Sequence, residues 1–140
     1  MPTRRPMRRT GVKAAPPPKA GFSARAVFAG LVFAFIFAVV AFLAWSLLFS
    51  LTSLPDQYMT YAAYGTSFIA VLLGGRLATI RAGGAGLLNG GIVGLAYALL
   101  LGALAALITT SPLSLGLAGL TRPLVDVLAG IIGGIMGNNG

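Results

Sequence analysis

The sequence predicts an all-α integral membrane protein, a bundle of four transmembrane helices packed through a glycine zipper. Three observations carry this prediction: the composition, the length of the apolar runs and the spacing of small residues. Of the 140 residues, 57% are hydrophobic and only 9% are charged. An average soluble domain carries about 25% charged residues, so this chain has too few charges to cover the surface of a water-soluble globule.

The first 25 residues differ from the rest and are expected to form a basic arm without regular structure. The segment 1–25 holds seven of the ten basic residues, no acid and five prolines, which interrupt helices. Such an arm attracts anionic lipid headgroups, and each basic residue near the membrane gains about 1 kcal/mol. The simpler interpretation, which we favour, is a topology signal that only keeps this end in the cytoplasm. If the arm has a binding partner, we expect anionic lipid headgroups and not nucleic acid.

Residues 26–140 are expected to form one membrane domain, because four apolar runs follow the arm. A helix needs about 20 residues to cross a hydrocarbon core of about 30 Å. The first three runs reach this length, whereas the fourth is shorter and carries two charged residues near its start. The expected spans cover residues 26–51, 58–80, 86–109 and 120–137.

The basic residues predict the orientation of the bundle. With a cytoplasmic N-terminus, the arm, Arg76 and Arg81 place nine of the ten basic residues on the cytoplasmic side, and only Arg122 lies outside. Positively charged residues are retained preferentially on the cytoplasmic side of a membrane. We therefore expect both termini in the cytoplasm.

Glycine supplies the expected helix packing. Small residues recur at every fourth position through the third run, and the fourth run repeats the GxxxG spacing that lets helix backbones approach closely in lipid. The glycines expected to pack helices are Gly86, Gly90, Gly94, Gly102, Gly130, Gly133, Gly134 and Gly137. Packing within one chain is the ordinary use of such ridges, and packing between chains of a homo-oligomer is the alternative.

Two sets of polar residues fall within or near the expected spans. Ionisable groups inside a membrane are costly and mark candidate functional sites. Arg76, Asn89 and Asn138 are expected at one cytoplasmic depth, where they would form a hydrogen-bonded cluster. The simpler interpretation of Arg76 is a side chain that reaches the headgroups. Arg122 and Asp126 are four residues apart, and this spacing predicts an ion pair on one helix face.

The composition excludes several function classes. The chain has no cysteine and no histidine, and its only acids are Asp56 and Asp126. The usual metal ligands, thiol nucleophiles and proton-shuttling imidazoles are therefore missing. We expect no enzyme activity, no catalytic residue, no cofactor and no metal site.

Two glycine-rich stretches carry a resemblance to a known family. Residues 74–95 with Tyr97 are similar to a GG-x-x-A-x-x-R core followed by glycines at every fourth position and a tyrosine. Residues 129–138 resemble its closing G-x-x-G-G-x-x-G-[VN]-N element. Over about residues 24–139, the chain thus resembles a family of small four-span bacterial membrane proteins, mainly from Gram-positive lineages, of uncharacterised function. The resemblance implies a bacterial plasma membrane and supplies no activity.

These observations favour a non-catalytic accessory, assembly or structural component of the bacterial plasma membrane, in contact with the bilayer and with a membrane-protein partner. The alternative is a small channel or transporter subunit that acts as a homo-oligomer. A continuous polar stripe along one helix would favour this alternative, and the sequence shows none.

Overall fold

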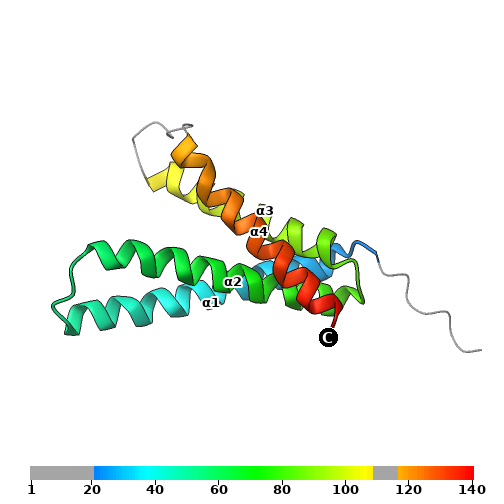
Figure 1. Ribbon diagram of the computed structural model, residues 1–140, viewed down its shortest axis with the longest axis horizontal. Helices are drawn as coiled ribbons and strands as arrows, with labels where there is room; N and C mark the ends of the chain where they lie inside the picture. Colours follow the sequence, from blue (N-terminus) through cyan, green and yellow to red (C-terminus); the bar gives the residue numbers. More distant parts are fainter. Residues whose placement is uncertain (1–20, 109–116) are drawn as a thin grey trace, which may run out of the picture.

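The computed structural model describes residues 21–108 and 117–140 and folds them into four α-helices (Figure 1). The helices are α1 (Ala24–Leu51), α2 (Gln57–Ala82), α3 (Gly86–Ile108) and α4 (Leu117–Asn138). All four are long and apolar enough to cross a membrane. The described residues contain no strand, so the prediction of an all-helical chain with four long apolar helices is confirmed.

The bounds differ from the expected ones by a few residues: α2 covers Gln57–Ala82 in place of 58–80, and α4 ends at Asn138 in place of 137. α1 begins at Ala24, so the last residues assigned to the basic arm are helical, and α4 begins upstream of the expected residue 120. The rest of the predicted arm, residues 1–20, and the end of the third predicted span lie outside the described residues.

Local sequence explains how α1 begins and how α2 turns into α3. The hydroxyl of Ser23 accepts a hydrogen bond from the backbone N–H of Ala26, which caps α1. α2 ends at Gly83 in the left-handed conformation, with a φ of 73° that glycine adopts without steric cost. Gly84 and Ala85 complete this short connection, also with positive φ. α2 and α3 are therefore joined by a tight turn.

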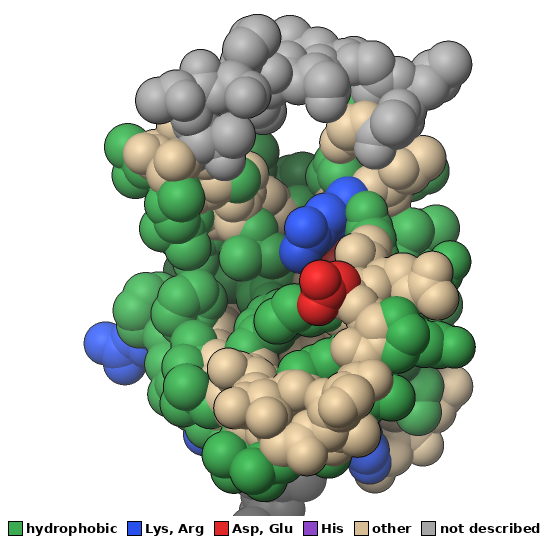
Figure 2. All heavy atoms as spheres, turned by 90° about the vertical axis from the view of Figure 1, so that its left-hand side faces the viewer, with side chains coloured by type: hydrophobic (Ala, Val, Ile, Leu, Met, Phe, Trp, Pro, Cys, Tyr) green, Lys and Arg blue, Asp and Glu red, His purple; other side chains and the backbone are tan. Residues whose placement is uncertain are grey.

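The helices form two hairpins that meet at one end and diverge at the other (Figure 1). α2 contacts the three other helices, whereas α1 does not touch α4 in the described residues. We call the end at the α2–α3 turn the closed end and the end at the α1–α2 connection the open end. Residues 103–108 of α3 are all exposed at the open end. Seen from this side, the surface is mainly apolar and hollowed between the hairpins, with basic and acidic side chains near the middle (Figure 2).

Glycine backbones make close helix contacts at the closed end. α1 crosses α2 at Gly30 and Gly74, where a Cβ added to either residue would lie 2.5–2.6 Å from the carbonyl oxygen of the other. α2 crosses α4 in the same way, since a Cβ on Gly75 would lie 2.6 Å from the carbonyl oxygen of Gly130. In lipid, such close approach gives van der Waals contact that larger residues would prevent.

Small residues fill the interior and large apolar residues face outward. The larger core cluster is made of alanines, Val71 and Tyr97, all at most 4% exposed. Most large leucine, isoleucine and phenylalanine side chains are exposed instead, such as Leu107 at 84%. Lipid tails solvate these side chains as well as a protein core would, so this distribution is typical of a membrane bundle.

Candidate functional site

Three glycines of α3 lie directly against the backbone of α4. Side chains at Gly86 and Gly90 would collide with the backbone of Gly134, and one at Gly94 would lie 2.5 Å from the carbonyl oxygen of Asp126. Gly130 lies opposite Gly90 and Gly94 from the other side. The α3–α4 hairpin is therefore in backbone contact along the closed half of α3.

Two further glycines of α4 face α2. A Cβ on Gly133 would collide with the backbone of Leu72, and one on Gly137 would lie 2.6 Å from the carbonyl oxygen of Arg76. Gly130 contacts Gly75 of α2 as well as α3, so three helices meet at this residue.

Gly102 departs from the predicted ridge. Nothing lies within 4 Å of the position that its Cβ would occupy. The prediction of a packing role is therefore wrong for Gly102 within the described chain, because each step of four residues turns about 40° past a full circle, so Gly102 has rotated off the face that Gly94 presents to α4. A repeat of four therefore winds around the helix and can leave the contact face of a neighbouring helix.

Asn89 of α3 is fully buried at the closed end and bonds backbone groups of two segments. Its side-chain oxygen accepts a hydrogen bond from the N–H of Ser23 at 3.2 Å. Its amide nitrogen donates to the carbonyl oxygens of Gly84 at 2.9 Å, Gly21 at 3.2 Å and Ala85 at 3.3 Å. Asn89 thus fastens the start of α1 to the α2–α3 turn.

The predicted cluster of Arg76, Asn89 and Asn138 is wrong for this chain. Arg76 and Asn138 are exposed, and in the described residues no hydrogen bond joins either of them to Asn89. The physical reason is that backbone groups of the turn and of the entry to α1 use both ends of the Asn89 amide. Shared depth in the membrane did not bring these side chains together.

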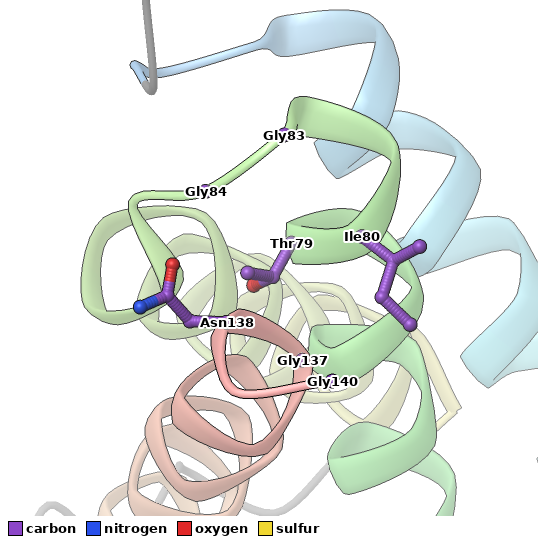
Figure 3. A pocket seen from close by; sticks show the side chains of 7 residues that line it. All are labelled: Thr79, Ile80, Gly83, Gly84, Gly137, Asn138 and Gly140. Carbon is purple, nitrogen blue, oxygen red and sulfur yellow. The ribbon is translucent and has the colours of Figure 1, made fainter.

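A pocket of about 160 Å³ lies beside Asn138 at the closed end (Figure 3). Its lining is largely glycine backbone, with Thr79 as one of the few polar side chains. The hydroxyl of Thr79 donates to the carbonyl oxygen of Gly75 at 3.0 Å within α2, so it already has a partner. We assign no ligand to this pocket.

A second polar site lies where the hairpins begin to diverge. Asp126 of α4 is only 3% exposed, and its carboxylate accepts a hydrogen bond from the hydroxyl of Ser67 on α2 at 3.1 Å. The hydroxyl of Tyr97 on α3 lies close to Ser67 but makes no hydrogen bond with any described residue. Three helices thus bring oxygen atoms together inside the bundle.

The predicted ion pair between Arg122 and Asp126 is also wrong in the described part of the chain. The guanidinium of Arg122 lies 5.3 Å from the centre of the Tyr64 ring on α2, at a distance typical of cation–π contacts. Helical side chains lean toward the N-terminus of their helix. The guanidinium of Arg122 therefore packs on Tyr64, whereas the carboxylate of Asp126 accepts its hydrogen bond from Ser67.

A third polar contact joins α1 and α2 next to this site. The indole Nε1–H of Trp45 donates to the hydroxyl of Thr66 at 3.0 Å, and the Trp45 ring packs beside Phe49 with centroids 6.1 Å apart. Sequence reasoning did not single out Trp45, Thr66 or Ser67. A single hydroxyl residue in an apolar run forms no sequence pattern that would predict its partner. The partner is known only from the way the helices cross in the structure.

We expect Thr66→Val to shift the fluorescence emission of Trp45 to shorter wavelength, because the indole N–H loses its acceptor. Trp45 is the only tryptophan, so the signal needs no assignment. The free energy of unfolding is expected to fall by about 1 kcal/mol, the usual value of one hydrogen bond. Emission spectra and thermal unfolding in detergent check this, with the exposed Thr60→Val as the matched control. Identical spectra for the two variants would contradict the prediction.

The four apolar helices, their glycine contacts and the polar groups inside the bundle define a multi-pass α-helical membrane protein. Within this class, the chain belongs to the DUF3792 family, which is described as a family of proteins of unknown function and whose model matches residues 23–137. The resemblance to a membrane protein family of unknown function is confirmed at this level. No curated protein and no solved structure matches the chain.

Proposed function

We propose that the protein is a non-catalytic accessory or assembly component of the bacterial plasma membrane, which acts by packing against the helices of a larger membrane protein. The observation that supports this proposal is the divergence of the two hairpins. At the open end, the last turns of α3 and most of the last third of α1 are exposed. These turns offer contact area at the depth of the lipid.

The closed end supports the same proposal, because it gives the diverging helices a rigid base. Glycine contacts hold α1 against α2 and α3 against α4. Recognition between helices in lipid depends on shape and on a few polar contacts. We call the two diverging hairpins with their shared closed end the wedge. Its exposed outer turns can offer a partner helix a complementary shape and polar contacts.

We expect gentle extraction of the tagged protein, followed by native mass spectrometry, to yield a complex with an unrelated membrane protein in fixed stoichiometry. Photo-crosslinkers at Leu107, which is 84% exposed at the open end, and at Leu87, which is 62% exposed at the closed end, form a matched pair. Leu107 should capture the same partner and Leu87 should not. A monomer or a pure homo-oligomer, with no captured partner, would reject the proposal.

We also propose that both termini are cytoplasmic and that the basic arm contacts anionic headgroups. The distribution of charge along the helices supports this orientation: Arg76 and Arg81 fall at the closed end of α2, and Arg122 falls near the start of α4. An excess of basic residues marks the cytoplasmic side.

Reporter fusions test the orientation directly. Fusions after residues 55, 84, 114 and 140 are expected to report outside, inside, outside and inside in that order, because each pair of sites is separated by one span. An external C-terminus, with the first three fusions reporting as expected, would contradict the four-span topology. If the N-terminus were external, all four fusions would report the opposite side, and the proposed orientation would be wrong.

The second candidate function is a small channel or transporter subunit that acts as a homo-oligomer. One observation favours it, namely the buried polar site of Asp126, Ser67 and Tyr97 between three helices. Polar groups buried in a membrane protein often mark ion or solute pathways. Flux of ions or solutes into liposomes that contain the purified protein would support this candidate over the accessory role.

A further inference from the structure

The polar site at the junction of the hairpins has an unused hydrogen-bonding group. Tyr97 is fully buried, and its hydroxyl has no hydrogen-bond partner among the described residues. Leaving a buried hydroxyl without a partner is costly, and such groups in native proteins call for an explanation such as a bound water or ion. Ser67 lies close to this hydroxyl and is itself only 2% exposed.

The same site holds a carboxylate that forms no ion pair with any residue the structure describes. Asp126 accepts a hydrogen bond from the neutral hydroxyl of Ser67. Arg122, on the same helix, places its guanidinium over the ring of Tyr64 on α2 instead. A buried carboxylate in a membrane is expensive unless a positive charge or hydrogen bonds compensate it.

We propose that Asp126, Ser67 and Tyr97 form a binding site for a sodium ion. Hard cations take oxygen ligands, and the site provides a carboxylate and two hydroxyl oxygens from α4, α2 and α3. One carboxylate balances the single charge of Na⁺. In the part of the chain that the structure describes, no group of three or more His, Cys, Asp or Glu side chains offers the donor set of a more highly charged metal ion.

The position of the site gives the bound ion a structural consequence. Its ligands come from α2 of one hairpin and from α3 and α4 of the other. An ion that is bound by all three helices therefore holds the hairpins together where they begin to diverge. This inference does not depend on the accessory role, because an ion can stabilise the wedge whether or not a partner packs against it.

Thermal unfolding of the full chain in detergent tests the proposal. At constant ionic strength, replacing choline chloride by sodium chloride is expected to raise the unfolding temperature in a saturable way. Asp126→Asn should abolish this response, whereas Asp56→Asn, which changes the exposed second acid of the chain, should keep it. Tyr97→Phe should raise the sodium concentration needed for half of the effect by about tenfold, the value of one lost polar contact.

Arg122→Gln separates two roles of the nearby positive charge. If the site binds sodium, removing the charge of Arg122 should lower the sodium concentration needed for half of the effect, because like charges repel. If Arg122 were instead the effective counter-charge of Asp126, this variant would lose stability and its sodium requirement would not fall, which would overturn the proposal.

A direct measurement on the unmodified protein completes the test and does not depend on the folding of any variant. Broadening of the ²³Na NMR line by the protein should saturate over the same concentration range. It should weaken on acidification, because a proton competes with sodium for the carboxylate of Asp126. The other charged or titratable groups near this carboxylate are Arg122, Tyr64 and Tyr97. Equal stability in sodium and choline without line broadening would overturn the proposal. A response to pH alone would also overturn it, since it would identify a proton site.

Discussion

Gly130→Ala is expected to unfold or severely destabilise the bundle, whereas Gly102→Ala leaves it intact. A Cβ on Gly130 would collide with the carbonyl oxygen of Gly90 and would lie 2.9 Å from the backbone nitrogen of Gly94. Backbone atoms cannot rotate away as the end of a side chain can, so α3 and α4 must move apart. Overpacking of a tight interior typically costs 1–3 kcal/mol or more. Because Gly130 also contacts Gly75, we expect a loss of about 3 kcal/mol.

Thermal unfolding in detergent and the yield of folded protein in membranes measure this effect. Gly102→Ala is the matched control, since it is the same substitution on α3 in open space. Gly102→Ala is expected to leave stability unchanged or to raise it by up to about 1 kcal/mol, because alanine favours the helix more than glycine does. Similar unfolding temperatures for the two variants would contradict the importance of the three-helix contact at Gly130.

Composition and span length were sufficient to predict the helices, because an apolar segment in lipid must satisfy its backbone hydrogen bonds within itself. A chain with 57% hydrophobic residues and apolar runs of about 20 residues has few alternatives in a membrane. The short gap between the expected spans 58–80 and 86–109 also agrees with the structure, where Gly83 supplies the left-handed conformation that ends α2. These features depend on local sequence alone.

The extent of the glycine contacts was less predictable than their spacing. Spacing identifies which face of α3 carries small residues, but the angle and position of the crossing decide how many of them are used. Gly94 still faces the backbone of Asp126, whereas Gly102, two turns further, lies in open space. A sequence repeat does not show which of its residues lie on the face that contacts the neighbouring helix.

The polar contacts could not be predicted because their partners lie on other helices. The rule for residues four apart paired Arg122 with Asp126 on their own helix, but Tyr64 and Ser67 of α2 are their actual partners. Hydrogen bonds in a membrane interior form wherever a crossing brings a donor to an acceptor. Each such contact depends on the tertiary arrangement and therefore appears only in the structure.

Asn89→Leu is expected to detach the start of α1 from the α2–α3 turn. Leucine fills a similar volume but provides no polar group, so the Ser23 N–H and the carbonyl oxygens of Gly21 and Gly84 lose their side-chain partner. A hydrogen bond contributes about 1 kcal/mol, and a buried group left without a partner costs about 1–3 kcal/mol. We therefore expect the free energy of unfolding to fall by about 2–4 kcal/mol.

Cysteine labelling can locate this change as well as detect it. The chain has no native cysteine, so Phe22→Cys introduces the only reactive thiol, on the residue between the two that Asn89 bonds. Labelling of this thiol by a water-soluble maleimide should be faster in the Asn89→Leu background, because the segment 21–23 is released from the turn. Asn139→Leu, at an exposed asparagine beyond the end of α4, is the matched control and should leave the labelling rate unchanged. Equal rates in all backgrounds would mean that the glycine contact between Gly30 and Gly74 alone holds α1 in place.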